Sequence, residues 1–316
     1  MISIKDFTII IPCISYQDVE QCIKNIRKVY KKIKIIVCLN KSNLKKNKDK
    51  NLKFIIAKTK SIGGKRNIAV KACKTKYLAF LDSDAYPNKN WVESTFKILK
   101  KKDNLIIAGP HVDPLQQNES EKIIGMVKKS FLITMKPALQ KGNREKAQYV
   151  SFLPSVNWIF PKKIFYFFNK MDNKMLRNED WDFIYKMRDT KFKMFYSPKS
   201  LVYHENSSIS RFIKKRFKYG FHMWPILIKL NFENYYFLIP LIFTIFLISF
   251  PLTFFLDSYL FLYLTILILY ISATLIETIR VCDKFKNFLK FFFTLVAGNI
   301  SPGFGIFFGI FKFLKF

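Results

Sequence analysis

Tyr77-Leu78-Ala79-Phe80-Leu81-Asp82-Ser83-Asp84 is the stretch that decides how this chain folds. Its first five residues are apolar, as in a buried strand, and two carboxylates two positions apart follow at once. In extended backbone, residues i and i+2 face the same side. Asp82 and Asp84 therefore point toward one spot, where they repel each other unless a cation lies between them. Oxygen ligands of this kind suit Mg²⁺ or Mn²⁺.

Strand and helix signals alternate on both sides of this stretch. Apolar runs predict strands, and helically spaced apolar residues predict helices between them. The predicted strands are Phe7–Ile11, Ile33–Leu39, Leu52–Ala57, Tyr77–Leu81 and Leu105–Gly109, and the predicted helices are Asp18–Tyr30, Gly63–Lys74 and Trp91–Lys101. The alternation predicts an α/β fold with a doubly wound, mostly parallel sheet. Ligands of such sheets bind beyond the carboxyl ends of the strands, where the Asp82–Asp84 loop lies.

Upstream of this loop, Gly63-Gly64-Lys65-Arg66-Asn67 opens a predicted helix. Glycines allow close backbone approach, and a helix N-terminus favours phosphate. Lys65 and Arg66 add positive charge. By itself such a segment is more often an ordinary loop before a helix.

Downstream, Asn178-Glu179-Asp180-Trp181-Asp182 opens another predicted helix, with Asn178 as its cap. Acidic residues in a first turn complement the helix dipole, which explains one or two of them. Three carboxylates around an aromatic residue exceed what capping requires. Further on, Val202-Tyr203-His204 ends a short predicted strand. A lone histidine is more often structural, but behind a carboxylate site His204 becomes a candidate metal ligand.

In this order, the segments resemble the family 2 glycosyltransferases with the GT-A fold. The resemblance covers about two-thirds of the chain and rests on Ile9-Ile10-Ile11-Pro12, Gly63-Gly64-Lys65-Arg66-Asn67, Leu81-Asp82-Ser83-Asp84, Glu179-Asp180-Trp181-Asp182 and Val202-Tyr203-His204. It implies inverting transfer of a sugar from a nucleotide-sugar donor to an acceptor by direct displacement.

The resemblance also implies a role for each matching residue. Asp82 and Asp84 match the D-x-D motif that binds ribose and the diphosphate-bound Mg²⁺ or Mn²⁺, and His204 matches a histidine that completes the metal shell. Asp180 matches the catalytic base, with Glu179 beside it. The residues expected to bind the donor are Pro12, Asn40, Gly64, Arg66, Asn67, Asp82 and Ser83.

Two departures from the family pattern narrow these expectations. Leu39 stands where the family usually has an acid that reads the nucleotide base, and Asn40 as its substitute leaves the choice of base open. The Q-x-x-R-W signature of processive polymer synthases is absent from the sequence. We therefore expect transfer of a single sugar.

The formal net charge of the 316-residue chain is +32. Such a charge suggests nucleic acid, an anionic membrane surface or a phosphorylated substrate, and compositional drift in a chain rich in Lys, Asn, Ile and Phe explains it equally well. We expect no nucleic-acid partner, because the sequence has no zinc-finger spacing and no aromatic RNA-binding signature. Five cysteines without a C-x-x-C pair favour a reduced compartment.

Apolar runs dominate the end of the chain. We therefore expect a GT-A catalytic domain over 1–206, a basic interfacial helix or linker over 207–232 and a membrane region over 233–316. Tyr235–Leu256 and Tyr259–Ile279 are each long enough to cross a bilayer. Phe291–Phe311 is also uncharged, but its glycines and Pro302 weaken a straight helix, and both a re-entrant and a spanning segment stay open.

Charge around these runs predicts the topology. The Asp257–Ser258 turn has no Lys or Arg, whereas several basic residues follow the second run between Arg280 and Lys290. The positive-inside rule then puts the catalytic domain on the cytoplasmic side of the plasma (inner) membrane.

The Ser208–Trp224 segment predicts a helix that mixes basic and aromatic residues. We expect it to lie against membrane lipid and to present a lipid-linked or glycan acceptor through Arg211, Lys214, Lys215 and Arg216. A solvated helix that links the domain to the membrane region explains the same pattern.

Other classes of function compete with glycosyl transfer. A non-catalytic membrane protein that retains the fold would not hydrolyse a donor. A nucleotidyltransferase would need a phosphate-bearing sugar substrate and gives no reason for the Glu179–Asp182 cluster. A membrane-associated nucleic-acid binder would lose affinity steeply with salt and would ignore nucleotide sugars.

Overall fold

The structure is a computed structural model that describes residues 3–41, 48–134, 141–142, 144–233 and 235–313. The chain forms two compact units. The first, which we call the head, comprises Met1–Pro114 and Ala138–Glu205, and the second, which we call the helical unit, comprises Leu115–Pro137 and Asn206–Phe316.

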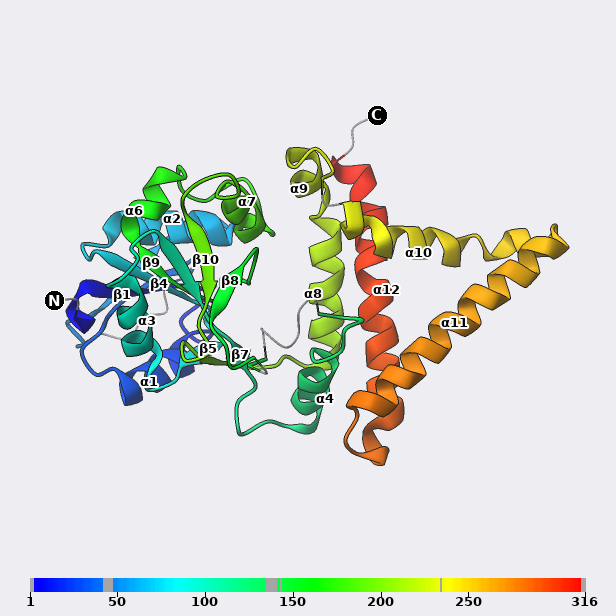
Figure 1. The fold of residues 1–316 in the computed structure, drawn as a ribbon, viewed down its shortest axis with the longest axis horizontal. Helices are drawn as coiled ribbons and strands as arrows, with labels where there is room; N and C mark the ends of the chain where they lie inside the picture. Colours follow the sequence, from blue (N-terminus) through cyan, green and yellow to red (C-terminus); the bar gives the residue numbers. More distant parts are fainter. Residues whose placement is uncertain (1–2, 42–47, 135–140, 143, 234, 314–316) are drawn as a thin grey trace. The chain divides into compact units, whose positions relative to one another are not determined.

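Within the described residues, the head is built on an eight-stranded sheet (Figure 1). The strands, in spatial order, are β3 (Leu52–Ile56), β2 (Lys34–Leu39), β1 (Phe7–Pro12), β4 (Tyr77–Leu81), β9 (Asn157–Pro161), β6 (Leu105–Ala108), β10 (Lys193–Tyr196) and β8 (Gln148–Val150). The first four are parallel to one another, and β6 is parallel to β10. The pairs β4–β9, β6–β9 and β10–β8 are antiparallel. The predicted mostly parallel α/β sheet is confirmed.

Helices cover both faces of this sheet, because apolar side chains project from both. Ile9 and Ile11 of β1 belong to one buried cluster and Ile10 to the other, since successive residues of a strand face opposite sides. The first cluster lies under α1 and α3, and the second under α2, α6 and α7. These helices are α1 (Glu20–Val29), α2 (Ile62–Ala72), α3 (Trp91–Leu99), α6 (Lys162–Phe167) and α7 (Glu179–Tyr185).

A second sheet of three short strands lies next to the carboxyl end of β4. Its order is β5 (Ala85–Pro87), β11 (Val202–His204) and β7 (His111–Val112). β11 is antiparallel to β5, so that His204 lies opposite Ala85. The sequence predicted a strand close to β11. β5 and β7 were not predicted, because they are too short to show periodicity.

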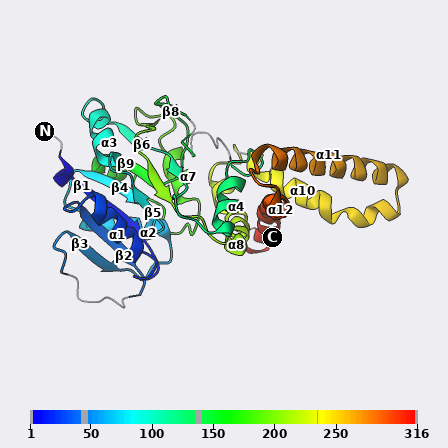
Figure 2. The same ribbon diagram turned by 90° about the horizontal axis from the view of Figure 1, so that it is seen from below.

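The helical unit contains the C-terminal helices and one helix from the middle of the chain (Figure 2). Its α-helices are α4 (Glu119–Val127), α8 (Ile209–Phe221), α9 (Trp224–Lys229), α10 (Ile239–Ile248), α11 (Asp257–Val281) and α12 (Phe288–Phe313). Single 3₁₀ turns lie before and after α10 and before α12, at Tyr235–Leu238, Phe250–Phe254 and Phe285–Asn287.

The observed units differ from the predicted domains in one segment. Leu115–Pro137 lies within the predicted 1–206 domain but packs with the helical unit. Ile124 of α4 is buried in a cluster with Phe212 of α8 and Leu295 of α12. The apolar partners of α4 are therefore far away in sequence, which hides this packing from a sequence-based boundary. α4 ends at Val127.

α12 is one continuous helix, although the sequence analysis expected its glycines and Pro302 to weaken it. Two glycines of the helical unit instead allow α8 and α12 to approach closely. A Cβ on Gly220 would lie 2.0 Å from the carbonyl oxygen of Pro302, and one on Gly305 would lie 2.1 Å from that of Phe217. Tertiary packing has thus overridden the local preference against a helix.

Arg216 of α8 compensates for the proline inside α12. Pro302 has no N–H, so the carbonyl of Gly298 four residues earlier loses its partner in the helix. Arg216 Nε donates to that carbonyl oxygen at 2.9 Å, and Nη1 donates to the Ile133 carbonyl oxygen at 3.3 Å. Arg216 therefore joins α8, α12 and the segment after α4.

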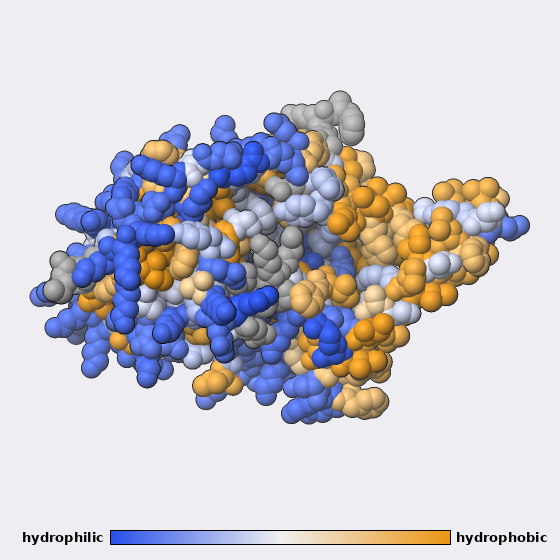
Figure 3. Space-filling view, viewed as in Figure 1, coloured by the Kyte–Doolittle hydropathy of each residue, from blue (hydrophilic) through white to orange (hydrophobic). Residues whose placement is uncertain are grey.

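Three segments of the helical unit are long and apolar enough to cross a membrane by length and composition: Tyr235–Phe254, Asp257–Val281 and Phe285–Phe313. Many large apolar side chains of the first two remain exposed, as expected for a surface that faces lipid. In Figure 3 apolar residues cover much of the visible surface of α10 and α11. The helices therefore fit membrane anchoring, and the third segment, whose form the sequence left open, is a single helix.

Candidate active site

Three side chains of the head form a group that can hold a metal ion. Asp82 and Asp84 lie in the loop between β4 and β5, and His204 ends β11. One ligand atom from each lies within 4.8 Å of the others, and His204 Nε2 is 3.2 Å from Asp84 Oδ1. The backbone N–H of Glu205 also donates to the Asp84 carbonyl oxygen at 2.9 Å. The pairing of β11 with β5 thus brings residues 120 positions apart to one point.

The chemistry of this group fits the predicted ion. Two carboxylates and one imidazole offer oxygen and nitrogen ligands without sulfur, a set that suits Mn²⁺ and Mg²⁺. The side chains of Asp82 and Asp84 are each 37% exposed, so a ligand from solvent can reach them. His204 packs edge-on against His111 of β7, with ring centroids 5.7 Å apart, which limits the orientations of its ring.

The acidic pair Glu179–Asp180 begins α7. The residue before it, Asn178, has a left-handed backbone with φ 63°, a conformation that Asn tolerates better than most residues. Asn178 occupies the predicted cap position, but its side chain makes no capping hydrogen bond. Asp180 is half-buried and accepts from the Ser155 N–H and Ser155 Oγ at 3.3 Å each, and from the Trp181 N–H at 2.9 Å. Glu179 is buried.

Burial changes the acidity of both carboxyls. It raises the pKa of Glu179 to about 7, with the charge of Asp180 adding to the effect and Arg66 opposing it. Burial also raises the pKa of Asp180, against the opposing charge of Arg66 and hydrogen bonds from the backbone. A carboxylate with a raised pKa is better suited to accept a proton near neutral pH.

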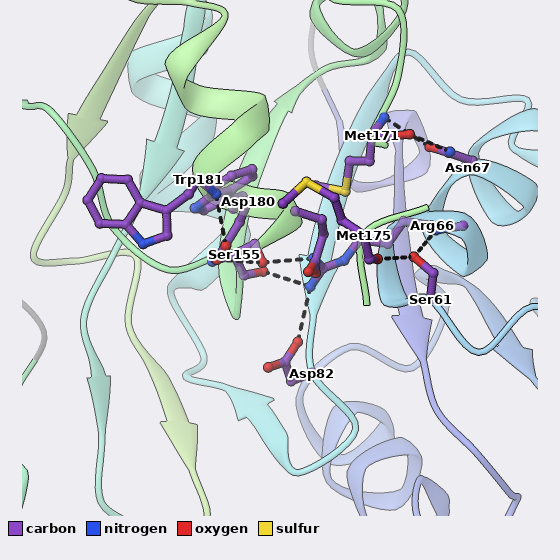
Figure 4. Close-up of polar contacts among 12 residues, drawn as sticks. Ser61, Arg66, Asn67, Asp82, Ser155, Met171, Met175, Asp180 and Trp181 are labelled. Carbon is purple, nitrogen blue, oxygen red and sulfur yellow. Dashed lines mark hydrogen bonds and ion pairs between the residues drawn. The ribbon is translucent and has the colours of Figure 1, made fainter. Parts of the chain in front are cut away.

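Arg66 connects this acidic pair to the D-x-D loop (Figure 4). It lies in α2 and its side chain is 1% exposed. Its Nη2 donates to Asp82 Oδ1 at 3.1 Å, and its Nη1 donates to Glu179 Oε1 at 3.3 Å and to Ser155 Oγ at 2.7 Å. The sequence predicted Arg66 at the donor, but Ser155 lies in no recognisable motif and was not predicted at the site.

Two other predicted donor-binding residues, Asn67 and Asn40, link neighbouring segments of the head by hydrogen bonds to the backbone. Asn67 Nδ2 donates to the Met171 carbonyl oxygen at 2.8 Å, and the Met171 N–H donates back to Asn67 Oδ1. Asn40 Nδ2 donates to the carbonyl oxygens of Ala57 and Thr59 at 2.8 Å each, which ties the end of β2 to the segment after β3. Roles for Asn67 and Asn40 at the donor stay predictions.

The remaining predicted donor residues lie at the ends of elements around the same edge of the sheet. Pro12 is the last residue of β1 and is buried. The Gly64 N–H donates to Ser61 Oγ at 3.2 Å, which caps α2. Ser83 lies between Asp82 and Asp84 and is half-buried. The expected binding of donor by these three residues stays a prediction.

One acidic residue of the predicted Glu179–Asp182 cluster, Asp182, does not belong to the site. The Asp182 side chain is 1% exposed and pairs with Lys186 at 2.9 Å, one turn along α7. The acidic cluster therefore divides into the Glu179–Asp180 pair and a carboxylate that stabilises its own helix. Trp181 stacks on Phe152 with ring centroids 3.8 Å apart.

The residues expected at the acceptor belong to the helical unit. Arg211 and Lys214 are exposed on α8, and Lys215 is half-buried. Arg216 is engaged with backbone carbonyls of α12 and of the segment after α4. The structure thus separates Arg216 from the other basic residues with which the sequence grouped it.

Comparison with known proteins assigns the head to a family. Residues 8–167 match the model of "Glycosyl transferase family 2", which is half of the chain. This chain belongs to glycosyl transferase family 2, and its head is an α/β domain with a mostly parallel sheet.

Individual relatives resemble the chain only in part. "Pre-mycofactocin glycosyltransferase" from two strains of Mycobacterium tuberculosis is 25% identical over 173 residues, which cover 52% of this chain and 34% of the relative. The chain thus spans about a third of the length of these curated relatives. Among solved structures, GalNAc-T7 with UDP, GalNAc and Mn²⁺ matches with a TM-score of 0.46 and 13% identity, over 63% of this chain and 43% of that one. S. aureus TarS 1–349 in complex with UDP matches with a TM-score of 0.45 and 17% identity, over 68% and 64% of the two chains.

Proposed function

We propose that this glycosyltransferase moves one sugar from a nucleotide-sugar donor to a lipid-linked glycan acceptor, with inversion of configuration, at the cytoplasmic face of the membrane. The observation that carries the proposal is the convergence of Asp82, Asp84 and His204 at the end of β4, with Arg66 linking Asp82 to Glu179. A metal-binding group and a base are the two parts that transfer from a nucleoside diphosphate needs.

Asp82, Asp84 and His204 would hold Mg²⁺ or Mn²⁺. The ion supplies charge that stabilises the leaving diphosphate. Asn40, the expected substitute for the acid that reads the nucleotide base, directs its amide nitrogen to the backbone carbonyls of Ala57 and Thr59.

Asp180 is the proposed base. Its carboxylate takes the proton of the acceptor hydroxyl while that oxygen attacks the anomeric carbon of the sugar. The bond from that carbon to the diphosphate breaks, and the nucleoside diphosphate leaves with the bonding electrons. Attack from the face opposite the leaving group inverts the configuration. The hydrogen bonds from Ser155 orient the carboxylate for this task.

The acceptor proposal rests on the helical unit. Arg211, Lys214 and Lys218 are exposed on α8 at i, i+3 and i+7, a spacing that aligns them on one side of the helix. The same unit contains the three segments that fit a membrane. Exposed basic residues of this kind attract anionic lipid and diphosphate groups, at roughly 1 kcal/mol for each charge near the surface.

A donor screen tests the enzymatic proposal. The full chain in detergent or nanodiscs is incubated with a panel of nucleotide sugars, and released nucleoside diphosphate is measured with and without lipid extract. Turnover with one donor, increased by lipid-linked acceptor, is the expected result. A chain that releases nucleoside diphosphate from no donor would be a non-catalytic relative, and one that releases pyrophosphate from a sugar phosphate and a nucleoside triphosphate would be a nucleotidyltransferase.

A charge-neutralised variant tests the acceptor proposal. Replacement of Arg211, Lys214 and Lys218 together by Gln should raise the apparent KM for the acceptor and leave donor hydrolysis intact. Arg216 is kept, because its loss would disturb α12. The matched control replaces three exposed lysines of the head, Lys31, Lys32 and Lys34. Equal acceptor kinetics in both triple variants would mean that α8 is only a connector.

A further inference from the structure

Arg66 is a buried cation held by several groups at once. Its guanidinium contacts Asp82, Glu179 and Ser155, and its carbon Cζ lies 4.9 Å from the centroid of the Phe80 ring. Nη2 also donates to the Ser155 carbonyl oxygen at 3.2 Å. Burying a charge is costly unless it is paired and hydrogen-bonded, and the planar guanidinium can bind several acceptors in fixed directions. The Arg66 side chain is 1% exposed, so a donor that enters from solvent has almost no access to it.

Ser155 extends the contacts of Arg66 to the proposed base. Its Oγ accepts from Arg66 Nη1 at 2.7 Å and lies 3.3 Å from Asp180 Oδ2, to which it can donate its proton. The Ser155 N–H donates to the same Asp180 oxygen. Asp82 and Asp180, which belong to the donor and acceptor sides of the proposed reaction, are thus the two ends of one hydrogen-bonded chain.

The loop before α7 does not depend on Arg66 for its attachment. Ser61 Oγ donates to the Met175 carbonyl oxygen at 2.7 Å, and Asn67 exchanges two hydrogen bonds with Met171. These contacts anchor the loop on α2 independently. Arg66 instead contacts the carboxyl group of Glu179, the first residue after this loop, and that of Asp82.

We infer that Arg66 is a positioning residue, which holds Glu179 directly and Asp180 through Ser155 in a fixed arrangement with Asp82. The inference rests on the proposed function and deepens it, because it replaces the expected role of Arg66 as a donor ligand. The residue acts on the rate of transfer through Asp180 and has no direct contact with the donor.

Kinetics distinguish positioning from donor binding. Arg66→Met should lower turnover by about 10²-fold, the lower range for loss of general-base catalysis, and leave the affinity for nucleoside diphosphate with Mn²⁺ unchanged. Arg66→Lys should recover part of the rate. In an Asp180→Asn background, Arg66→Met should lower turnover no further, because the effects of residues that act as one unit are not additive. The inference would be overturned if Arg66→Met weakened nucleoside diphosphate binding. It would also be overturned if Arg66→Met lowered turnover by the same factor in the Asp180→Asn background as in wild type.

Arg27→Met is the matched control. Arg27 also pairs with a carboxylate, Asp49 at 2.7 Å, and donates to the carbonyl oxygens of Tyr30 and Ile33. Ile33 precedes β2, so this arginine lies at the amino-terminal edge of the parallel strands, opposite the site. Its loss should lower stability and leave turnover at permissive temperature unchanged.

Amide hydrogen exchange gives a readout that does not need turnover. Arg66→Met should speed exchange of the Ser155 and Trp181 amides, which donate to Asp180, while the Met171 amide, held by Asn67, stays protected. Unchanged exchange at Ser155 and Trp181 would overturn the inference. If no donor is turned over in the screen described above, the proposed function fails, and hydrogen exchange still decides whether Arg66 positions the pair.

Discussion

Glu179 should make the stability of the head fall as pH rises, and Glu179→Gln should remove that dependence. Its side chain is 6% exposed, and burial together with Asp180 raises its pKa to about 7 from 4.5. The folded state therefore binds the proton more tightly than the unfolded state. The stability that this provides is complete below pH 4.5 and is lost as pH rises through 7. Linkage converts a shift of this size into about 2–3 kcal/mol between pH 5 and pH 8.

The assay is urea unfolding of the full chain in micelles, followed by tryptophan fluorescence. Trp91, Trp158 and Trp181 all lie in the head, so the signal reports mainly on this unit. The free energy of unfolding of Glu179→Gln minus that of wild type should increase by about 2–3 kcal/mol from pH 5 to pH 8, because Gln has no proton to lose. The increase should shrink in an Asp180→Asn background, since Asp180 contributes to the raised pKa. A difference that stays constant with pH would refute the assignment of a raised pKa to Glu179.

The remaining predictions concern the base, the α8–α12 contact and the topology. Asp180→Asn should lower turnover by roughly 10²–10⁴ and keep donor binding, and an active Asp180→Asn with an inactive Glu179→Gln would reverse their roles. Arg216→Met should cost about 1–3 kcal/mol by leaving the Gly298 carbonyl unpaired. The cost should shrink with Pro302→Ala, which restores an N–H for that carbonyl, and equal costs in both backgrounds would contradict the pairing. Ser258→Cys, in a chain whose native Cys282 is replaced by Ser, should react with an impermeant thiol reagent from outside the cell, and labelling only after permeabilisation would reverse the topology.

The central elements of the head were predictable because their signals are local. Tyr77–Leu81 is apolar at every position and is followed by Asp82 and Asp84, and β4 has these bounds. Both faces of such a strand are buried, so that the residues need no partner information to be recognised. His204 was only a candidate ligand in the sequence, because a lone histidine is more often structural and this one lies 120 positions after Asp84.

The unpredicted features depend on contacts between distant segments. Ser155 lies between Arg66 and Asp180, and nothing in its own neighbourhood marks it. The same holds for β5 and β7, whose few residues become strands only through pairing with β11. Rules based on neighbouring residues therefore predict a strand such as β4 and miss features that form only through contacts between distant segments.

The helical unit shows the opposite error, in which a local rule gave too strong a prediction. Glycine and proline normally weaken a helix, but Gly305 meets the backbone of α8, and Arg216 replaces the hydrogen bond that Pro302 removes. The segment Leu115–Pro137 was assigned to the head because its position in the sequence was the only available guide. Two of its buried partners, Phe291 and Leu295, come more than 150 residues later.

Metal dependence of transfer is the most direct test of the whole account. The full chain is assayed with the donor found in the screen, first in excess chelator and then after addition of Mn²⁺ or Mg²⁺. Because Asp82, Asp84 and His204 converge on one point, turnover should be nearly abolished by chelation and restored by the ion. Asp84→Asn should stay inactive in the presence of the ion. Unchanged turnover in excess chelator, or full activity of Asp84→Asn, would contradict the assignment of this group as the catalytic metal site.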